Sequence, residues 1–266
     1  METAISKDGT TIAYDRFGSG PALINVLGAT ATRGMAAPQG DAESNSPFTT
    51  YIYDRRGRGD SGDTQPFSAE REIEDLEAMI DAAGGSAFVF GHSSGAVLAL
   101  RAAGKLGKKI SKLALYEPPF IIDQSRPPIP ADYVPHLRQL IAEGRPEDAL
   151  IYFMTVAVGV PAEYIDGMKQ APFWASSVKV AHTISYDGEI MGDTMWGDPA
   201  SLKQFATTAT PTLVMVGSNS PEYQQNAVTS LAKIMPNAHY RSMAGQDHGI
   251  APEVLGPALA EFFLEE

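Results

Sequence analysis

The N-terminal part of the chain consists of short apolar runs separated by polar turns. Residues 3–20, "TAISKDGTTIAYDRFGSG", alternate polar and apolar positions around Asp8-Gly9, which predicts a β-hairpin. The run "ALINVLG" (Ala22–Gly28) is continuously apolar and ends in glycine, as a buried strand does. Residues 49–62, "TTYIYDRRGRGDSG", predict another strand that leads into a glycine-rich turn.

The following segments alternate between helical and strand patterns. Residues 68–84 predict a helix with Ser68 as its N-cap. Its apolar residues recur at helical spacing and form one face: Ile73, Leu76, Met79 and Ile80. A strand at Ala87–Phe90, a helix at Ala96–Leu106 and a strand at Lys112–Tyr116 come next. Apolar strands that alternate with helices indicate a mostly parallel sheet covered on both faces.

The rhythm breaks between Ile121 and Ala206. Prolines cluster near the start of this segment, and helical patterns follow without a clear strand, at residues 135–144, 146–159 and 161–170. Strands and helices then alternate again at residues 210–217, 224–234, 238–244 and 251–266. We therefore predict an α/β core domain formed by residues 1–120 and 207–266, with residues 121–206 inserted as a helical cap (lid) after the sixth strand.

Composition excludes several classes of function. The 266 residues carry a formal net charge of -12 with a pI of about 4.8, which argues against nucleic acid or an anionic membrane surface as partner. The same charge disfavours a strongly anionic substrate. No cysteine is present, so disulfides, thiolate metal sites and a cysteine nucleophile are excluded. Neither a signal peptide nor a transmembrane run is recognisable, which predicts a cytoplasmic protein. A homodimer is compatible with the sequence.

The turn between the strand at Ala87–Phe90 and the next helix carries the pattern G-x-S-x-G, from Gly91 to Gly95. A serine at so sharp a strand-to-helix bend projects its hydroxyl over the sheet edge, and the flanking glycines let strand and helix approach closely. The N-terminus of the helix also points backbone N–H groups at developing negative charge. This context predicts that Ser93 is a nucleophile.

A serine hydroxyl needs a general base, and the chain has five histidines. His92 lies within the turn and should point away from an exposed Ser93. His136 and His182 are in the insertion, and His239 is in a strand. His248 lies in the loop after the last strand, on the edge of the sheet where the turn at Ser93 also lies. His248 is therefore the predicted base.

The base needs a carboxylate to orient it, and here the sequence departs from the usual pattern. The loop after the penultimate strand normally supplies an aspartate, but this chain has Ser218-Asn219-Ser220 at that place. Glu117 directly follows an apolar strand and precedes two prolines, on the same edge of the sheet. Glu117 is the predicted acid, with Glu222, Asp123 and Asp247 as alternatives. The backbone N–H groups of Ser94 and Ala29 are the predicted oxyanion hole.

The order Ser93, acid, His248, together with the glycine turn after "YIYDRRGRGDSG" and the helical insertion, resembles the α/β-hydrolase superfamily over essentially the whole chain. The histidine-glycine pair that usually precedes the oxyanion donor is Leu27-Gly28 here. The placement of the acid at Glu117 resembles the zearalenone-lactonase branch. The resemblance implies a serine hydrolase with a catalytic triad and no metal or cofactor.

We therefore expect an esterase or lactonase that acts on a small molecule with an apolar portion, through an acyl-enzyme. The open alternatives are carbon–carbon bond hydrolysis, perhydrolysis of the haloperoxidase type, amide hydrolysis, and a ligand receptor or non-hydrolytic cyclase on the same scaffold. Large side chains of the insertion either line the pocket or form the insertion's own core: Phe153, Met154, Trp174 and Trp196, with Phe173 and Met191. The "RGDS" string at Arg58–Ser61 is predicted to be a structural turn and not an integrin-binding motif.

Overall fold

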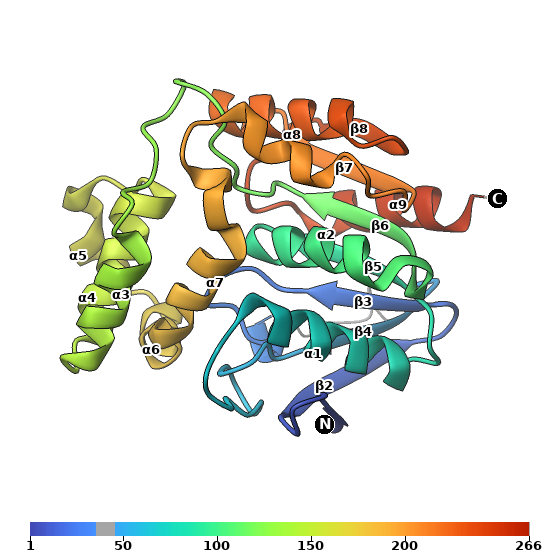
Figure 1. The fold of residues 1–266 in the computed structure, drawn as a ribbon, viewed down its shortest axis with the longest axis horizontal. Coiled ribbons are helices and arrows are strands. Elements are labelled where there is room, and N and C mark those ends of the chain that lie inside the picture. Colours follow the sequence, from blue (N-terminus) through green and yellow to red (C-terminus); the bar gives the residue numbers. More distant parts are fainter. Residues whose placement is uncertain (36–45, 266) are drawn as a thin grey trace.

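The computed structural model describes residues 1–35 and 46–265. Among these residues one eight-stranded sheet has the order β1-β2-β4-β3-β5-β6-β7-β8 (Figure 1). The pairs β1–β2 and β2–β4 are antiparallel, and all other neighbours are parallel. The strands are β1 Glu2–Ile5, β2 Thr11–Gly18, β3 Ala22–Val26, β4 Thr49–Tyr53, β5 Ala87–His92, β6 Ile110–Tyr116, β7 Thr212–Gly217 and β8 Ala238–Met243.

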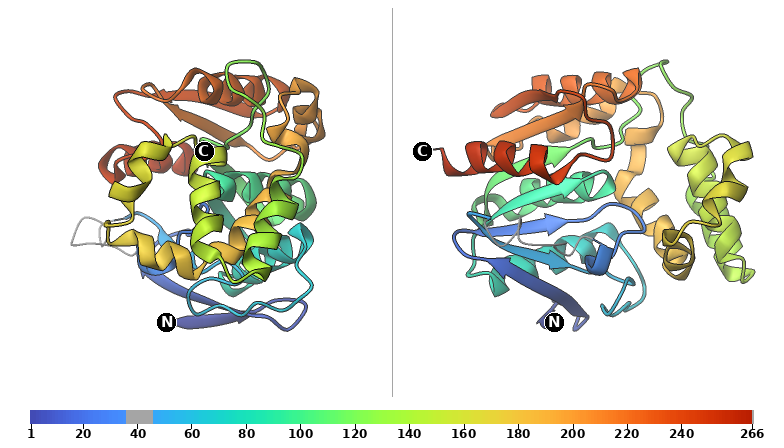
Figure 2. Two further views of the ribbon diagram at one scale, coloured as in Figure 1. Left: turned by 90° about the vertical axis from the view of Figure 1, so that its left-hand side faces the viewer. Right: turned by 180° about the vertical axis from the view of Figure 1, so that it is seen from behind.

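Helices cover both faces of this sheet (Figures 1 and 2). One face carries α1 (Ala69–Ala82), α2 (Ser94–Leu106) and α8 (Glu222–Ile234), whose apolar side chains join the larger of two core clusters. The other face carries α9 (Pro252–Leu264), which packs in the second cluster. This arrangement confirms the predicted α/β fold. Ser68 occupies the N-cap position of α1 as predicted, although its side chain makes no capping hydrogen bond.

The described elements between β6 and β7 are helical. They are α3 Tyr133–Ala142, α4 Pro146–Tyr152, a π-helical turn at Phe153–Val158, α5 Ile165–Met168, α6 Phe173–Lys179, α7 Ile184–Met191 and several short 3₁₀ turns. Figures 1 and 2 show α3 to α6 standing over the carboxyl edge of the parallel strands, with α7 between them and α2. The exact division into core and cap stays a prediction.

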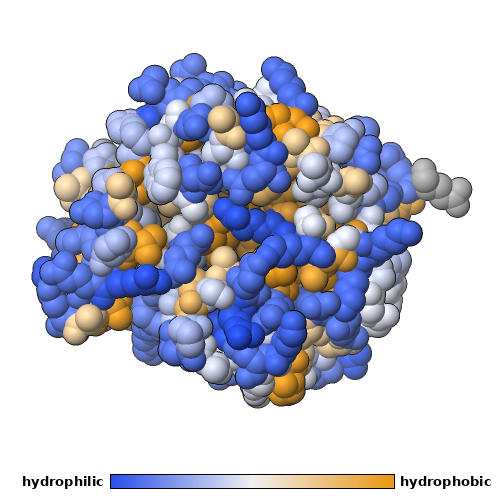
Figure 3. Space-filling view, in the orientation of Figure 1, coloured by the Kyte–Doolittle hydropathy of each residue, from blue (hydrophilic) through white to orange (hydrophobic). Residues whose placement is uncertain are grey.

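The surface in the view of Figure 3 is dominated by hydrophilic residues, with apolar residues visible only between them. This distribution accords with the acidic composition. Within residues 1–35 and 46–265, none of the helices combines the length and the apolar character that a membrane span would need.

Candidate active site

Ser93 lies where β5 ends and α2 begins, in a backbone conformation that a serine rarely adopts. Its φ is 56° and its ψ is -128°. The backbone N–H of Ser93 donates to the Tyr116 carbonyl at 2.9 Å, which ties the bend to β6. A Cβ atom at Gly95 would lie 2.2 Å from the Val26 carbonyl oxygen, so only glycine lets α2 approach β3 this closely. The predicted bend is thus present, with its predicted steric reason.

Positive φ angles point to the same edge of the sheet. Within the described residues, the non-glycine residues with positive φ are Thr30 (60°), Ser93 (56°) and Glu117 (49°). Each follows the carboxyl end of a parallel strand. Such backbone conformations cost about 1–3 kcal/mol each and gather at functional sites, where the surrounding fold holds them in place. The strain therefore marks this edge as a candidate active site.

The predicted acid and the predicted base are in direct contact. The Glu117 Oε2 lies 2.7 Å from the His248 Nδ1, which leaves Nε2 of His248 as the ring nitrogen available to a substrate or nucleophile. The Glu117 side chain is 1% exposed, whereas that of His248 is 51% exposed. Asp123 instead accepts hydrogen bonds from Ser125 and Asn226, so it is occupied elsewhere.

The loop that has no aspartate still contributes to this pair. Ser220 donates its hydroxyl hydrogen to Oε1 of Glu117, and the Gly217 N–H donates to the same oxygen at 2.8 Å. Burial alone would raise the pKa of Glu117, but the hydrogen bonds from His248, Ser220 and Gly217 outweigh it and bring the pKa below its ordinary value. The carboxylate is therefore held ionised beside the imidazole.

The loop that carries His248 is held by two residues that the sequence reasoning did not assign to the site. The Tyr116 hydroxyl donates to the Asp247 carbonyl, and His92 Nε2 lies 2.9 Å from the His248 carbonyl oxygen. Burial, together with the nearby His248, lowers the pKa of His92 to about 4. His92 is therefore neutral at neutral pH, and the tautomer that donates to this carbonyl positions the loop. Its place beside Ser93 in G-x-S-x-G was the only signal available in the sequence.

A cavity of about 230 Å³ opens at this edge of the sheet. Ser93 and His248 both line it, and so do Ser94 and Ala29, the predicted oxyanion-hole residues. Ser94 is the first residue of α2, where a backbone N–H has no acceptor within the helix. Gly28 brings the loop of Ala29 against the nucleophile, because a Cβ at Gly28 would lie 3.1 Å from the Ser93 Cβ. The structure thus brings all five predicted core residues together.

Only some of the large side chains of the insertion that were considered as pocket residues line this cavity. Phe153 and Met191 line the cavity. Met154, Trp174 and Trp196 are not among the residues that line it, so this cavity gives no support to their predicted role in substrate binding, which stays a prediction. Trp174 is only 4% exposed and donates its indole N–H to Glu147, while Trp196 is 56% exposed at the surface. Met154 and Phe173 pack against the core cluster. Apolar character alone did not separate pocket from core.

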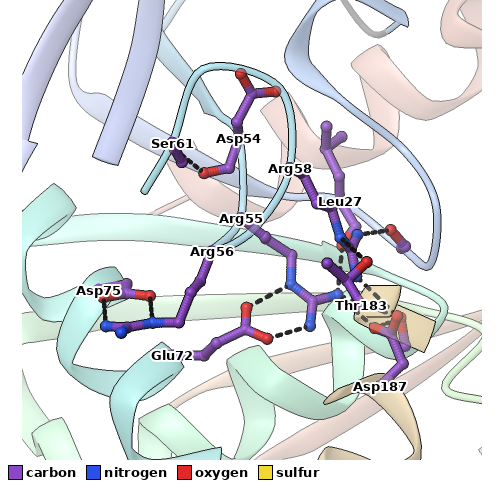
Figure 4. Close-up of polar contacts among 12 residues, drawn as sticks. Leu27, Asp54, Arg55, Arg56, Arg58, Ser61, Glu72, Asp75, Thr183 and Asp187 are labelled. Carbon is purple, nitrogen blue, oxygen red and sulfur yellow. Dashed lines mark hydrogen bonds and ion pairs between the residues drawn. The ribbon is translucent and has the colours of Figure 1, made fainter. Parts of the chain in front are cut away.

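A buried group of charges, which was not predicted from the sequence, reaches the cavity through Asp187 (Figure 4). We call Arg55, Arg58, Glu72 and Asp187 the arginine cluster. Arg55 donates to both oxygens of Glu72 at 2.7 and 2.9 Å and to the Asp187 Oδ1 at 2.7 Å. Arg58 donates to the other Asp187 oxygen at 2.7 Å. Two guanidinium groups are thus balanced by two carboxylates.

The arginine cluster joins α7, which belongs to the predicted cap, to Ser94 and to the loop that leads to Ala29, the two predicted oxyanion-hole residues. Arg58 donates to the Gly28 carbonyl at 2.6 Å, and Arg55 donates to the Leu27 carbonyl at 3.2 Å. Asp187, in α7, accepts the hydroxyl hydrogen of Ser94 at 2.7 Å. The side chain of Ser94 therefore belongs to this junction, while its backbone N–H is the predicted oxyanion donor. Arg58 is 1% exposed, which confirms that the "RGDS" string is a structural turn.

Charge pairing sets the ionisation of Asp187. Burial would raise the pKa of this carboxyl, but the positive charges of Arg55 and Arg58 outweigh burial and lower it. Asp187 is therefore ionised although it is almost completely buried.

Comparisons with known proteins agree with this geometry. A model of the alpha/beta hydrolase family matches residues 28–255. The crystal structure of an alpha/beta hydrolase from Sphaerobacter thermophilus is 50% identical, with 98% of this chain and 100% of that chain covered and a TM-score of 0.90. The enol-lactonase of Burkholderia xenovorans is 21% identical, with 99% and 100% covered and a TM-score of 0.72, which is a likeness of fold.

One curated relative is similar over a shorter stretch. N-formylmaleamate deformylase of Pseudomonas putida is 34% identical over 122 residues, which are 43% of this chain and 44% of the relative. The match therefore spans less than half of that protein. The resemblance of the acid placement to the zearalenone-lactonase branch stays a prediction.

Proposed function

The chain belongs to the alpha/beta hydrolase family, and from this premise we propose that it is a serine hydrolase that cleaves a carboxylic ester or lactone through an acyl-enzyme. The observation that carries the proposal is the meeting of Ser93 with the hydrogen-bonded pair of His248 and Glu117 around one cavity. A strained serine at a helix N-terminus, a histidine with a free ring nitrogen and a buried ionised carboxylate are the parts that acyl transfer needs.

The first half of the proposed reaction forms the acyl-enzyme. The Ser93 hydroxyl oxygen attacks the carbonyl carbon of the substrate while Nε2 of His248 accepts the hydroxyl proton. The negative charge that develops on the carbonyl oxygen is stabilised by the N–H groups of Ala29 and Ser94. Glu117 stabilises the imidazolium through Nδ1, at the 2.7 Å contact. When the tetrahedral intermediate collapses, Nε2 of His248 returns the proton to the departing alcohol oxygen.

The second half of the reaction frees the enzyme. A water molecule attacks the acyl carbon while His248 removes its proton, and the same oxyanion hole stabilises the second intermediate. Collapse of that intermediate returns the proton to Ser93 and releases the acid. In a lactone both products stay in one molecule, a hydroxy acid. The cavity of about 230 Å³ lies below the roughly 300–1,000 Å³ usual for small-molecule sites, which favours short acyl groups.

Amide hydrolysis is the second candidate, because the partial match to N-formylmaleamate deformylase points to it. The same serine, base and oxyanion donors would act, but His248 would protonate the nitrogen of the leaving group instead of an alcohol oxygen. Release of formate from an N-formyl amide, compared with release of alcohol from an ester of equal size, separates the two candidates.

Covalent trapping of Ser93 tests the proposal. We expect a fluorophosphonate to label Ser93, and a short-chain p-nitrophenyl ester to give a burst of p-nitrophenol. Exchange of Ser93 for Ala should abolish the label and lower turnover by about three to six powers of ten, as in other triads.

Ser242→Ala, which changes an exposed serine in β8, is the matched control and should leave both readouts unchanged. Labelling that persists in Ser93→Ala would exclude Ser93 as nucleophile. Tight ligand binding without turnover in the parent protein would favour a receptor over an enzyme.

A further inference from the structure

Arg126 lies in the cap, in the loop between β6 and α3, and lines the same cavity as Ser93 and His248. The other charged residues that line the cavity are Glu117 and Asp187. Arg126 is therefore the arginine that the described cavity presents to a bound molecule.

The contacts of Arg126 use only part of its hydrogen-bonding capacity. One terminal nitrogen donates to the Val156 carbonyl at 2.9 Å, and the guanidinium carbon lies 4.9 Å from the centre of the Tyr223 ring. Within residues 1–35 and 46–265, no carboxylate forms an ion pair with Arg126, whereas Arg55 and Arg58 are both paired. A guanidinium has five N–H donors in a planar fork, and most of this fork remains open.

The negative charges of the cavity are already compensated. Glu117 is bound to His248, Ser220 and Gly217, and Asp187 is bound to Arg55, Arg58 and Ser94. Neither carboxylate is left to neutralise Arg126. The cavity walls near it are largely apolar, among them Ile129, Phe153 and Ala157. In such surroundings the electrostatic attraction between an anion and a guanidinium is stronger than it is in water.

A purely structural role would explain less of this geometry. Arg126 does donate to the Val156 carbonyl, which lies in the last turn before the helix ends at Val158, where carbonyls have no partner within the helix. That role needs a single donor and no cavity. It leaves unexplained why a charged fork lies at the wall of the cavity that also holds Ser93.

We propose that Arg126 binds a carboxylate of the substrate, so that the substrate is an ester or lactone that itself carries a carboxylate group. The inference rests on the proposed function, because it names the substrate class of that site. The guanidinium fork fits a carboxylate in a two-pronged contact, which fixes the orientation of the substrate as well as its charge. The scissile carbonyl would then be held toward Ser93.

The net charge of the chain opposes this proposal only at long range. A net charge of -12 repels anions in general, but exposed charges are screened beyond about 8–10 Å at physiological ionic strength. A direct contact with Arg126 inside the cavity acts at about 3 Å, where the local pair outweighs the distant field. The expected specificity is therefore for small monoanions and not for polyanions.

Matched ester pairs test the proposal. The acyl-side pair is the p-nitrophenyl monoester of glutaric acid and its methyl ester, and the leaving-group pair is p-acetoxybenzoate and its methyl ester. We expect the parent enzyme to prefer the carboxylate member of at least one pair by about tenfold or more in kcat/KM. Arg126→Met should bring that ratio to about one, chiefly through KM, and Arg126→Lys should restore part of it.

The ratio within each variant is the readout, because a loss of stability would lower both rates together. Arg138→Met is the control: Arg138 is a cap arginine in α3 that pairs with Glu189 and is not among the residues that line the cavity. It should keep the parental ratio. Equal rates within both pairs in the parent, or a preference that survives in Arg126→Met, would overturn the inference.

A binding measurement separates this inference from the proposed function. Calorimetry with monomethyl glutarate and p-acetoxybenzoate, both monoanions, on the Ser93→Ala protein should detect millimolar or tighter binding that Ser93→Ala/Arg126→Met lacks. Carboxylate binding through Arg126 without any ester hydrolysis by the parent would disprove the hydrolase proposal alone. Ester hydrolysis without carboxylate binding or preference would disprove the role of Arg126 alone.

Discussion

Two buried carboxylates line the same cavity, one at the edge of the sheet and one in the predicted cap, and their partners differ in kind. Glu117, after β6, faces the half-exposed ring of His248. Asp187, in the cap helix α7, faces Arg55 and Arg58, whose side chains are both at most 1% exposed. Histidine gains and loses a proton near neutral pH, whereas arginine does not.

Because their partners differ, the surroundings of Glu117 and those of Asp187 suit different functions. At the core edge a carboxylate beside an exposed imidazole can stabilise a charge that appears and disappears during a reaction. In the arginine cluster all charges are permanent and paired, so Asp187 fixes α7 to the carbonyls of Leu27 and Gly28 through the arginines. The cavity therefore lies between a region suited to proton transfer and a region suited to rigid positioning.

Removal of the charge at the core edge should have the largest effect on activity. Glu117→Gln keeps the shape of the side chain but leaves the imidazolium without its partner, and can change the preferred tautomer of His248. The expected loss in kcat is about four powers of ten, which corresponds to roughly 5 kcal/mol. Steady-state kinetics on a p-nitrophenyl ester measure it, with little change expected in substrate binding.

The alternative acids provide the controls for Glu117. Asp123→Asn and Glu222→Gln should stay within about tenfold of the parent, because Asp123 bonds to Ser125 and Asn226 and Glu222 begins α8. Near-full activity in Glu117→Gln, with a collapse in either control, would place the acid elsewhere.

The arginine cluster should show its effect in stability first. Asp187→Asn leaves two buried guanidinium groups to share one remaining carboxylate, and loss of one partner of a buried ion pair typically costs about 3–5 kcal/mol. Urea denaturation measures the change in the free energy of unfolding. Asp193→Asn, at an exposed position whose side chain accepts a hydrogen bond from Gln204 at 3.1 Å, should cost about 0.5 kcal/mol or less. Similar losses in the two variants would show that the cluster is not the junction inferred from its contacts.

Local patterns in the sequence were sufficient to predict the sheet, the bend at Ser93 and the position of His248. Each depends on neighbours along the chain: apolar runs that end in glycine, and loops that follow strand ends. Glu117 could also be predicted, because a carboxylate that directly follows a buried strand leaves the sheet at a known edge. The fold then determined that these loops meet, since the carboxyl ends of parallel strands lie on one side.

The arginine cluster and the cap side of the cavity could not be predicted in this way. Arg55 and Asp187 are 132 positions apart, and no periodicity indicates which face of α7 meets the turn after β4. Trp174 and Phe153 belong to equally apolar helical segments, yet one is core and the other lines the cavity. Which side chain faces a cavity is decided by the angles at which helices pack, and a pattern of apolar residues fixes those angles only loosely.

The smallest expected effect distinguishes the two regions by pH. Burial lowers the pKa of His92 to about 4, and the His248 ring, whose centre lies 4.7 Å away, adds to the shift. In the unfolded chain a histidine titrates near about 6.5, so between about pH 6.5 and pH 4 the unfolded state binds more protons than the folded state. The free energy of unfolding should therefore fall as pH falls through this window, by at most about 3.4 kcal/mol at 1.36 kcal/mol per unit.

His92→Gln, which keeps a donor for the His248 carbonyl but cannot titrate, should remove this part of the pH dependence of the free energy of unfolding, measured by urea denaturation. His239→Gln, at an exposed position in β8, should keep the parental slope. The arginine cluster contains no histidine and should not contribute to this pH dependence. Identical dependence of the free energy of unfolding on pH in the parent and in His92→Gln would mean that His92 is not held neutral beside the loop of His248.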